Sequence, residues 1–333
     1  DYLSGGDGND LLIAGGDHST GSNITDTYPG GEDFDTVSYA NATEGVNINL
    51  QSGVHLGAAA SDILSQIEGF VLSNYNDRIS IGSSDTVGYR LLGLAGSDSR
   101  TGGAGNDTLD GGSGINLLIG GGGADTFNSL GVGTNTVSYA SSRAAVTVDL
   151  AAQTGTGGDA QGDTVSAGLA RLIGSSYNDV LSGAGIGETL DGGLGNDTLT
   201  GNGADVLKGG EGTDSLTGGA GNDRFVFDWL LTAALLEDTS TDFIVGQDKI
   251  VLDASVFSGL NGVGLANALS SVSLFAGVPG RVMGTAARII IEDQALNPSL
   301  VYYDADGSTA GAAVLIARVN TTANLSASDF LLV

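Results

Sequence analysis

The sequence contains no cysteine, only three prolines and only two histidines among its 333 residues. The absence of cysteine excludes disulfide bonds and thiolate metal sites. The scarcity of proline excludes collagen-like chains and polyproline rods. No apolar run is long enough to cross a bilayer, and the first residues show no basic segment followed by an apolar one. We therefore expect no membrane-spanning segment.

Basic residues are scarce as well. Eleven lysines and arginines stand against 39 aspartates and glutamates, which gives a formal net charge of −28. Such a chain repels nucleic acid and anionic membrane surfaces and attracts cations, so nucleic acid is not an expected partner. Because the carboxylates repel one another in a compact form, we expect a cation to neutralise them when the chain folds.

The motifs of the common catalytic sites are missing too. Neither histidine lies in H-E-x-x-H, no G-x-S-x-G elbow occurs, and there is no G-x-x-x-x-G-K-[ST] loop. Two carboxylates could form a glycosidase pair, but the sequence does not place any two of them opposite each other. We therefore assign no catalytic residue and expect this stretch not to be an enzyme, while an upstream catalytic domain stays open.

Glycine is abundant, with 57 residues, many of which lie in a nine-residue repeat. Six units match the pattern G-G-x-G-x-D-x-(apolar)-x at every fixed place: 5–13, 102–110, 120–128, 192–200, 209–217 and 218–226. Four more keep part of it: 93–101 with Leu94 and Arg100, 111–119 with Asn116, 183–191 with Glu188, and 201–208, which is one residue short. A flexible linker has no reason to keep an apolar residue in phase with the glycines, so the repeat predicts a solenoid.

A longer repeat lies between the glycine blocks. The stretch at 35–53 recurs at 135–153, and SNYNDRIS at 73–80 recurs as SSYNDVLS at 175–182. The first two-thirds of the chain therefore reads as a tandem duplication. Residues 1–4 read as the second half of a nonapeptide, so we expect the sequence to continue upstream.

Each fixed place of the nonapeptide has a physical role. Glycine at places one, two and four permits a positive-φ turn and close approach of the backbone, and the last three residues form a short strand with one inward side chain. Two units close one turn, so equivalent residues recur about 18 apart, as Asp107 and Asp125 do. Stacked turns then bring carboxylates and glycine carbonyls together, and such hard oxygen ligands favour calcium. The alternative is that these aspartates form only Asx-turns.

The repeats of residues 1–226 resemble the RTX (repeats-in-toxin) nonapeptide family. The resemblance implies an all-β fold, a right-handed parallel β-roll solenoid with a C-terminal β-rich cap, which holds several Ca²⁺ ions between successive turns. The implied metal ligands are Gly6, Gly8, Asp10, Asp98, Gly103, Gly105, Asp107, Gly112, Gly114, Asn116, Gly121, Gly123, Asp125, Asp179, Gly193, Gly195, Asp197, Gly203, Asp205, Gly210, Gly212, Asp214, Gly219, Gly221 and Asp223. Asn116, Glu188 and the short unit 201–208 depart from the family pattern, so the sites at these places are the exceptions.

The last third of the chain consists of strand-like runs separated by turns and ends in SASDFLLV. This region resembles the C-terminal cap and uncleaved secretion region of RTX proteins that type I systems export. We expect five segments: 1–92 as the start of the roll with a first strand-rich insert, 93–133 as an RTX block, 134–182 as a second insert, 183–226 as a second RTX block, and 227–333 as the cap and secretion region.

The combined features favour an extracellular protein, either secreted or at the cell surface. The leading interpretation is a structural protein of the surface-layer or adhesin type, whose partners are calcium, the type I secretion apparatus, and either further copies of itself or a cell-surface polysaccharide. The alternative is the calcium-dependent folding and secretion module of a larger RTX hydrolase or toxin. The duplicated unit of about 100 residues favours the structural interpretation, because arrays of repeats lengthen fibres and layers.

Overall fold

The structure, a computed structural model, describes residues 2–14, 25–129, 133–228, 238–257, 288–292, 298–304, 314–321 and 323–333. These residues form β-strands joined by turns and loops, with two short 3₁₀-helices, η1 (Gly158–Ala160) and η3 (Ala327–Asp329), and no α-helix among them. The chain divides into two compact units, residues 1–173 (unit 1) and residues 174–333 (unit 2).

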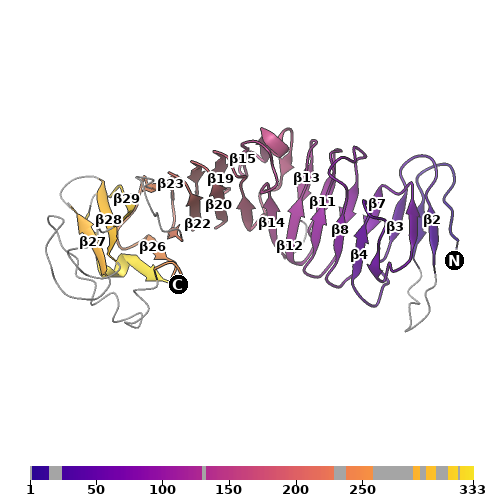
Figure 1. The fold of residues 1–333 in the computed structure, drawn as a ribbon, viewed down its shortest axis with the longest axis horizontal. Helices are drawn as coiled ribbons and strands as arrows, with labels where there is room; N and C mark the ends of the chain where they lie inside the picture. Colours follow the sequence, from indigo (N-terminus) through magenta and orange to yellow (C-terminus); the bar gives the residue numbers. More distant parts are fainter. Residues whose placement is uncertain are drawn as a thin grey trace. The chain divides into compact units, whose positions relative to one another are not determined.

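Unit 1 contains two long sheets of stacked strands (Figure 1). Sheet A has the order β1 (Leu11–Ile13), β3 (Thr36–Ser38), β7 (Gly69–Val71), β9 (Arg90–Leu92), β11 (Thr108–Asp110), β13 (Thr126–Asn128) and β17 (Thr164–Val165). Sheet B has the order β5 (Leu56–Gly57), β4 (Val46–Asn49), β8 (Arg78–Ser80), β10 (Ser99–Thr101), β12 (Gly114–Ile119), β14 (Gly133–Ser138) and β18 (Arg171–Ile173). Two smaller pairs are β2 (Thr27–Pro29) with β6 (Ile63–Ser65) and β15 (Thr147–Asp149) with β16 (Thr154–Thr156).

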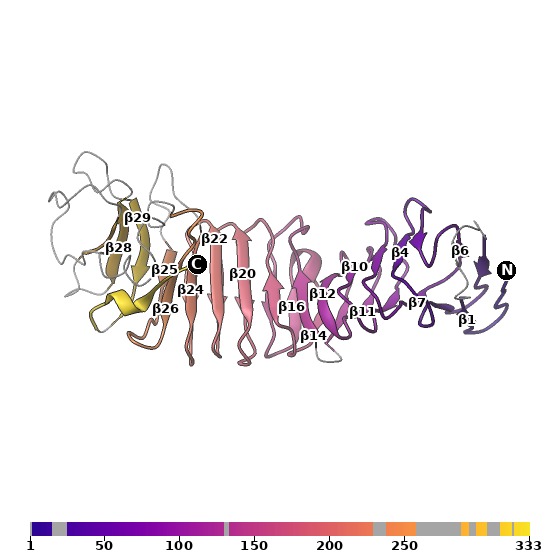
Figure 2. The same ribbon diagram turned by 90° about the horizontal axis from the view of Figure 1, so that it is seen from below.

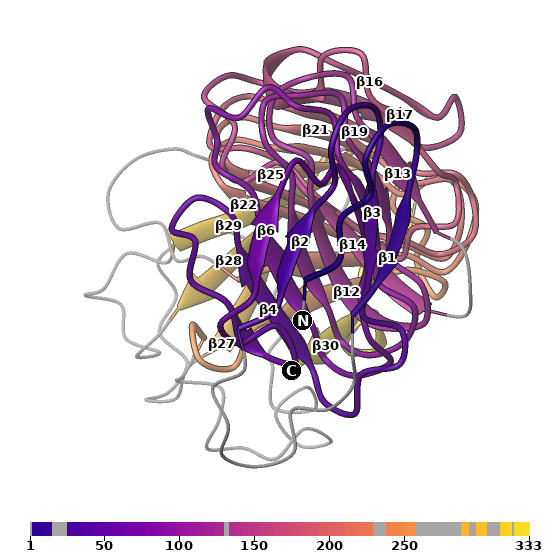
Figure 3. The same ribbon diagram turned by 90° about the vertical axis from the view of Figure 1, so that its right-hand side faces the viewer.

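From β8 to β14 the strands of unit 1 alternate between sheets B and A, so two strands make one turn of a coil. Figure 3 views this coil along the direction in which its turns stack. The register is parallel and regular: Leu109 lies beside Leu91 on one side and beside Phe127 on the other. All three side chains are buried, because the eighth place of a nonapeptide, which Leu109 and Phe127 occupy, faces the interior of the coil, and Leu91 has the matching place on β9.

Unit 2 repeats this alternation (Figure 2). Its sheet C has the order β19 (Val180–Ser182), β21 (Thr198–Thr200), β23 (Ser215–Thr217), β25 (Asp238–Ser240), β29 (Val314–Val319), β28 (Ser299–Asp304) and β27 (Arg288–Glu292). Its sheet D has the order β20 (Thr189–Leu194), β22 (Val206–Glu211), β24 (Arg224–Phe227), β26 (Lys249–Leu252) and β30 (Phe330–Leu332). Strands β27, β28 and β29 pair antiparallel to one another, unlike the parallel pairs of the repeats.

The predicted all-β parallel β-roll is confirmed. The strand-rich stretches between the glycine blocks do not form separate layers in unit 1, because β3, β7 and β17 lie in sheet A together with the repeat strands. The duplication is visible in side-chain contacts as well. Tyr39 donates to Asp62 at 2.7 Å and Tyr139 donates to Asp163 at 2.8 Å, and both hydrogen bonds are buried.

Candidate calcium-binding loops

The side chain at the sixth place of each nonapeptide joins one turn of the roll to the next. In the 102–128 block, Asp125 Oδ1 accepts the backbone N–H of Asp107 at 2.8 Å. The same bond joins the pairs Asp179–Asp197, Asp197–Asp214 and Asp205–Asp223 at 2.8 to 2.9 Å. The partners are 17 or 18 residues apart, as the sequence predicts for two units per turn.

The first glycine of each unit makes room for the aspartate of that unit. A Cβ atom on Gly120 would collide with Asp125 Oδ2, and one on Gly192 would collide with Asp197 Oδ2. The sequence-based site omitted these first-place glycines. The sequence does indicate a role for these first-place glycines, because all six complete units begin with two glycines.

The second and fourth glycines bring backbone carbonyls of neighbouring turns close together. Gly121 has φ = 100° and Gly123 has φ = 118°, in the left-handed region that favours glycine. A Cβ on Gly121 would collide with the carbonyl oxygen of Gly103, and one on Gly123 with that of Gly105. The structure therefore brings together the loops that the sequence predicts to share an ion.

The predicted glycines of the other loops stack in the same way, each against the backbone of the preceding turn. These contacts are Gly112 with Leu94, Gly114 with Gly96, Gly193 with Ser175, Gly195 with Tyr177, Gly210 with Gly193, Gly212 with Gly195, Gly219 with Asn202, and Gly221 with Gly203. At Gly6 a Cβ would meet no atom, and it is Gly31 of the following loop that stacks against the carbonyl of Gly6. Gly8 lies in open space but has φ = 98°, so its backbone has the same turn conformation.

The second carboxylate oxygens, Oδ2, of the sixth-place aspartates fall into two classes. At Asp107 this oxygen accepts the N–H of Gly103 at 2.8 Å, and at Asp205 it accepts the N–H groups of Asn202 and Gly203. Backbone N–H groups two to four residues earlier therefore satisfy the second oxygen of these two aspartates, whereas an Asx-turn would use the N–H two residues later. In a second class, Oδ2 is buried and has no hydrogen-bond partner among the described residues: Asp10, Asp35, Asp125, Asp197, Asp214 and Asp223.

The electrostatics of three aspartates in this second class, Asp125, Asp197 and Asp223, favour a bound cation. Burial, together with the neighbouring charges of Asp163 and Asp107, raises the pKa of Asp125 to about 8. Burial likewise raises the pKa of Asp197 to about 7 and that of Asp223 to about 6. A carboxylate with such a pKa is stabilised in the fold by taking up a proton or by lying beside a positive charge.

The donor set fits calcium. Free carboxylate oxygens and stacked glycine carbonyls are hard oxygen ligands, and neither cysteine nor histidine takes part in the loops. In the part of the chain that the structure describes, no group of three or more acidic, histidine or cysteine side chains lies close enough to hold a metal ion. An ion in these loops would thus depend on backbone carbonyls as well as on the aspartates.

The predicted ligand row on sheet B differs from the others. Asp98 Oδ2 is not free, because Arg100 Nη2 lies 2.6 Å away in an ion pair whose two side chains are fully buried. Asn116 and Asn135 follow on the next turns, and Asn116 Nδ2 donates to Asn135 Oδ1 at 2.8 Å. Asp98 and Asn116 therefore lack a free buried oxygen, as Asp107 and Asp205 do.

The rows of hydrogen-bonded sixth-place residues on successive turns also continue into residues that the repeat pattern misses. Asp125 donates its N–H to Asp163, Asp214 donates to Asp238, and Asp223 donates to Asp248. Glu188 stands at the start of one row, where its N–H donates to Asp205 Oδ1 at 2.7 Å. The sequence gives a partial indication of two of these residues. Asp163 and Asp248 each stand two places before an inward apolar residue, as the aspartate of a complete unit does.

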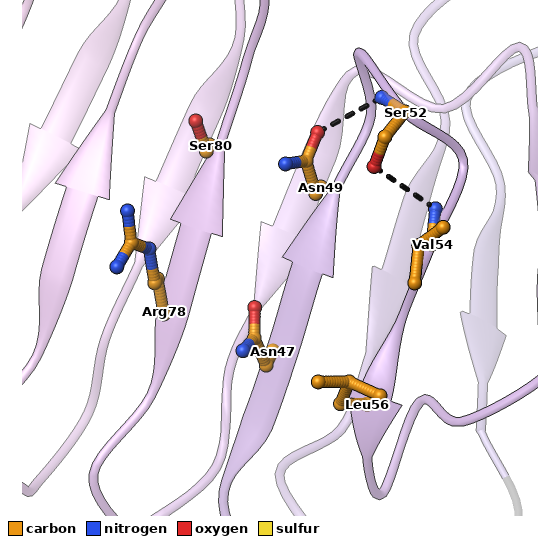
Figure 4. A pocket seen from close by; sticks show the side chains of 7 residues that line it. All are labelled: Asn47, Asn49, Ser52, Val54, Leu56, Arg78 and Ser80. Atoms are coloured by element: carbon orange, nitrogen blue, oxygen red, sulfur yellow. Dashed lines mark hydrogen bonds between the residues drawn. The ribbon is translucent and has the colours of Figure 1, made fainter.

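A pocket of about 240 Å³ lies away from these loops, on the outer face of sheet B (Figure 4). Its lining residues are Asn47, Asn49, Ser52, Val54, Leu56, Arg78 and Ser80. Asn49 Oδ1 accepts the N–H of Ser52 at 2.9 Å, which holds the turn beside the pocket. The lining offers amide, hydroxyl and guanidinium groups without a carboxylate or imidazole, so it supplies hydrogen bonds rather than a general acid or base.

The family comparison agrees with the geometry of the loops. The model of the RTX calcium-binding nonapeptide repeat (four copies) matches residues 1–20, 101–131, 166–199, 185–214 and 199–229. The chain carries RTX calcium-binding repeats. No curated protein matches the sequence. Among the described residues, no helix is long and apolar enough to cross a membrane.

Proposed function

We propose that this RTX chain is a calcium-folded roll that belongs to a secreted or cell-surface structural protein of the surface-layer or adhesin type. The observation that carries the proposal is the row of buried aspartate oxygens without hydrogen-bond partners among the described residues, such as those of Asp125 and Asp197. A buried carboxylate without a compensating charge strongly disfavours folding. Calcium supplies that charge, and so links folding to the presence of the ion.

The structural role is supported by the way the chain repeats. Each turn pairs in register with the next through one short strand per sheet, as β11 does with β13. A fold of this kind is lengthened by adding turns, and the duplicated unit of the sequence adds several at once. The pocket on sheet B fits this role better than a catalytic one, because its lining residues offer amide, hydroxyl and guanidinium groups for hydrogen bonds and no carboxylate or imidazole. We assign no enzymatic activity to this chain.

Export is the second half of the proposed function and rests on resemblance. The terminal SASDFLLV is similar to the acidic and apolar ends of RTX proteins that type I systems secrete, and RTX repeats are typical of secreted proteins. The alternative role, as the folding and secretion module of a larger hydrolase or toxin, shares the same calcium chemistry. The sequence upstream of Asp1 separates the two: a catalytic motif there favours the module, and further repeats favour the structural protein.

The test of the calcium function is folding in the presence and absence of the ion. In chelator, circular dichroism should show a largely disordered chain, and millimolar calcium should restore a β-rich spectrum over a narrow concentration range. Several sites coupled through shared turns make the transition steep, and each site filled at 100 times its dissociation constant adds about 2.7 kcal/mol of stability. An unchanged β-rich spectrum in chelator, with no gain in thermal stability on adding calcium, contradicts the proposal.

A further inference from the structure

Residues 30–38, with the sequence GGEDFDTVS, keep every fixed place of the nonapeptide except the fourth, where Asp33 replaces glycine. They lie outside all the ranges that the family model matches. Asp33 nevertheless has φ = 76°, in the left-handed region that the glycine of this place adopts elsewhere. Aspartate is one of the few other residues that tolerate this conformation. The backbone of 30–38 therefore folds as a repeat unit in spite of the substitution.

This unit stacks against residues 5–13 by the hydrogen bonds that join complete units. Asp10 donates its N–H to Asp35 Oδ1 at 2.9 Å, and Phe34 donates its N–H to Asn9 Oδ1 at 3.1 Å. The same two bonds, from the sixth and fifth places, join the loops of the 102–128 block. The loops 5–10 and 30–35 thus form a pair with the geometry of two consecutive RTX turns, although 25 residues separate their aspartates.

The pair encloses two free carboxylate oxygens. Asp35 is fully buried and its Oδ2 has no hydrogen-bond partner among the described residues, and the same holds for Oδ2 of Asp10. A Cβ on Gly30 would collide with Oδ2 of Asp35, and one on Gly5 with Oδ2 of Asp10, so the glycines provide the space for these oxygens. The 102–128 pair encloses only one such oxygen, that of Asp125.

We propose that the loops 5–10 and 30–35 together bind a calcium ion, at a site that continues the roll into a unit the repeat family model does not match. The site rests on the calcium function proposed above. Asp35 is fully buried and Asp10 half-buried, both have a buried free oxygen that a cation would compensate, and no ion pair joins either one to a basic side chain among the described residues. Oxygen-only ligands select calcium over a transition metal.

Asp77 provides a matched control in the same unit. It is also buried and also joins two turns, since its Oδ1 accepts the N–H of Val46 at 2.7 Å. Its oxygens, however, are satisfied by Ser73, whose N–H donates to Oδ2 and whose hydroxyl donates to Oδ1. Asp77 therefore has no free oxygen for a cation, and we infer no site there.

The test counts the calcium ions bound by the full chain, by native mass spectrometry in calcium buffers, for the parent, Asp35→Asn and Asp77→Asn. Asparagine keeps the Oδ1 acceptor for the N–H of Asp10 and removes the charge. Asp35→Asn should bind one ion fewer than the parent, whereas Asp77→Asn should bind as many. Equal numbers for the parent and Asp35→Asn, or the same loss in Asp77→Asn, overturn the site.

A second measurement on the parent protein remains decisive if Asp35→Asn does not fold. Calcium should slow amide hydrogen exchange in 5–13 and 30–38 together, as it should in 102–128. Protection of 102–128 without protection of 30–38 overturns the site while leaving the proposed function intact. A parent chain that binds no calcium at all contradicts the proposed function itself, so the two failures are distinguishable.

Discussion

At the scale of single residues, the sixth-place aspartates with a free oxygen use their two carboxylate oxygens differently. One oxygen accepts the N–H of the preceding turn, as Asp125 Oδ1 does from Asp107, and the other is left for a cation. Asparagine keeps the first function and loses the second. At Asn116 the amide nitrogen points instead to Asn135, so the turn-to-turn contact is neutral.

Replacement of Asp125 by alanine should weaken the 102–128 block far more than the 192–226 block. The variant leaves the buried N–H of Asp107 unpaired, at a cost of about 1–3 kcal/mol, and removes a calcium ligand as well. Hydrogen exchange in calcium measures both blocks in one experiment. The mirror variant Asp197→Ala should show the opposite pattern, and equal loss in both blocks from either variant argues against local sites.

The raised pKa values predict how the metal-free fold responds to pH. In the fold the pKa of Asp125 is about 8 against an ordinary value of 3.8, so the folded state binds a proton more tightly than the unfolded state. The stabilisation from this proton is complete below about pH 4 and is lost as the pH rises through about 8. In metal-free buffer, circular dichroism should therefore show a largely disordered chain at pH 9 and a larger β-rich fraction at pH 5.

Calcium and Asp125→Asn provide the controls for this pH trend. Saturating calcium replaces the proton at the free oxygen, so the β-rich fraction at high pH should recover. Asp125→Asn removes one titrating group, so the trend should become shallower. Stability that rises with pH in metal-free buffer would rule out the protonated carboxylates.

At the scale of elements, sheet B contains a buried basic side chain, that of Arg100. Arg100 occupies an inward place on β10, between Ile79 of β8 and Leu118 of β12, where every neighbouring strand has an apolar residue. Its guanidinium reaches Asp98 Oδ2 and also donates to the carbonyl of Gly111 at 3.3 Å. This strand therefore neutralises its aspartate internally, whereas the aspartates before β1, β3 and β13 of sheet A keep a free oxygen.

Replacement of Arg100 by leucine restores the apolar pattern of the strand and yet should destabilise unit 1. Removing one partner of a buried ion pair leaves the other charge uncompensated, at a cost of about 3–5 kcal/mol. The double variant Arg100→Leu/Asp98→Asn, which is neutral, should recover most of the loss. Chemical denaturation in calcium measures both variants. A single variant as stable as the parent would show that the ion pair contributes nothing.

The sequence predicts this architecture well wherever the nine-residue spacing is intact. It places Leu109, Leu199 and Leu216 in the interior, and all three are fully buried. It misses Asp35 and Asp163, because the spacing to the next turn becomes 25 and 38 residues at these positions. Only the parallel register of the strands shows that such distant residues occupy equivalent places.

The sequence also cannot tell which carboxylates are free. Asp107 and Asp125 stand in identical patterns, yet Oδ2 of the first accepts the N–H of Gly103 and Oδ2 of the second has no partner among the described residues. The difference arises from the conformation of each loop, which the local sequence does not specify. At Arg100 the pattern departs visibly, but the ion pair with Asp98 becomes evident only from the geometry.

At the scale of the whole molecule, the end of the chain is part of the fold. Strand β30 pairs in parallel with β26, with Phe330 beside Ile250, and Phe330 and Leu332 are buried. Asp329 precedes the strand and accepts the N–H of Gly246 through Oδ1 at 2.9 Å. The last residues thus include the terminal strand of sheet D, and the side chains of Phe330 and Leu332 become accessible only when this strand opens.

If calcium drives folding, it should also hide this segment, and the absence of native cysteine makes the change measurable with single cysteine probes. Leu332→Cys places a thiol at a side chain that is 9% exposed, whereas Val333→Cys places one at a side chain that is 59% exposed. Calcium should slow the reaction of the Leu332→Cys variant with a thiol reagent by at least about tenfold, which requires an opening free energy of only about 1.4 kcal/mol. The Val333→Cys variant should react quickly with and without calcium, because its thiol stays in solvent. Equal rates for the Leu332→Cys variant in chelator and in calcium would mean that β30 does not form on calcium binding, and that folding leaves the end of the chain accessible.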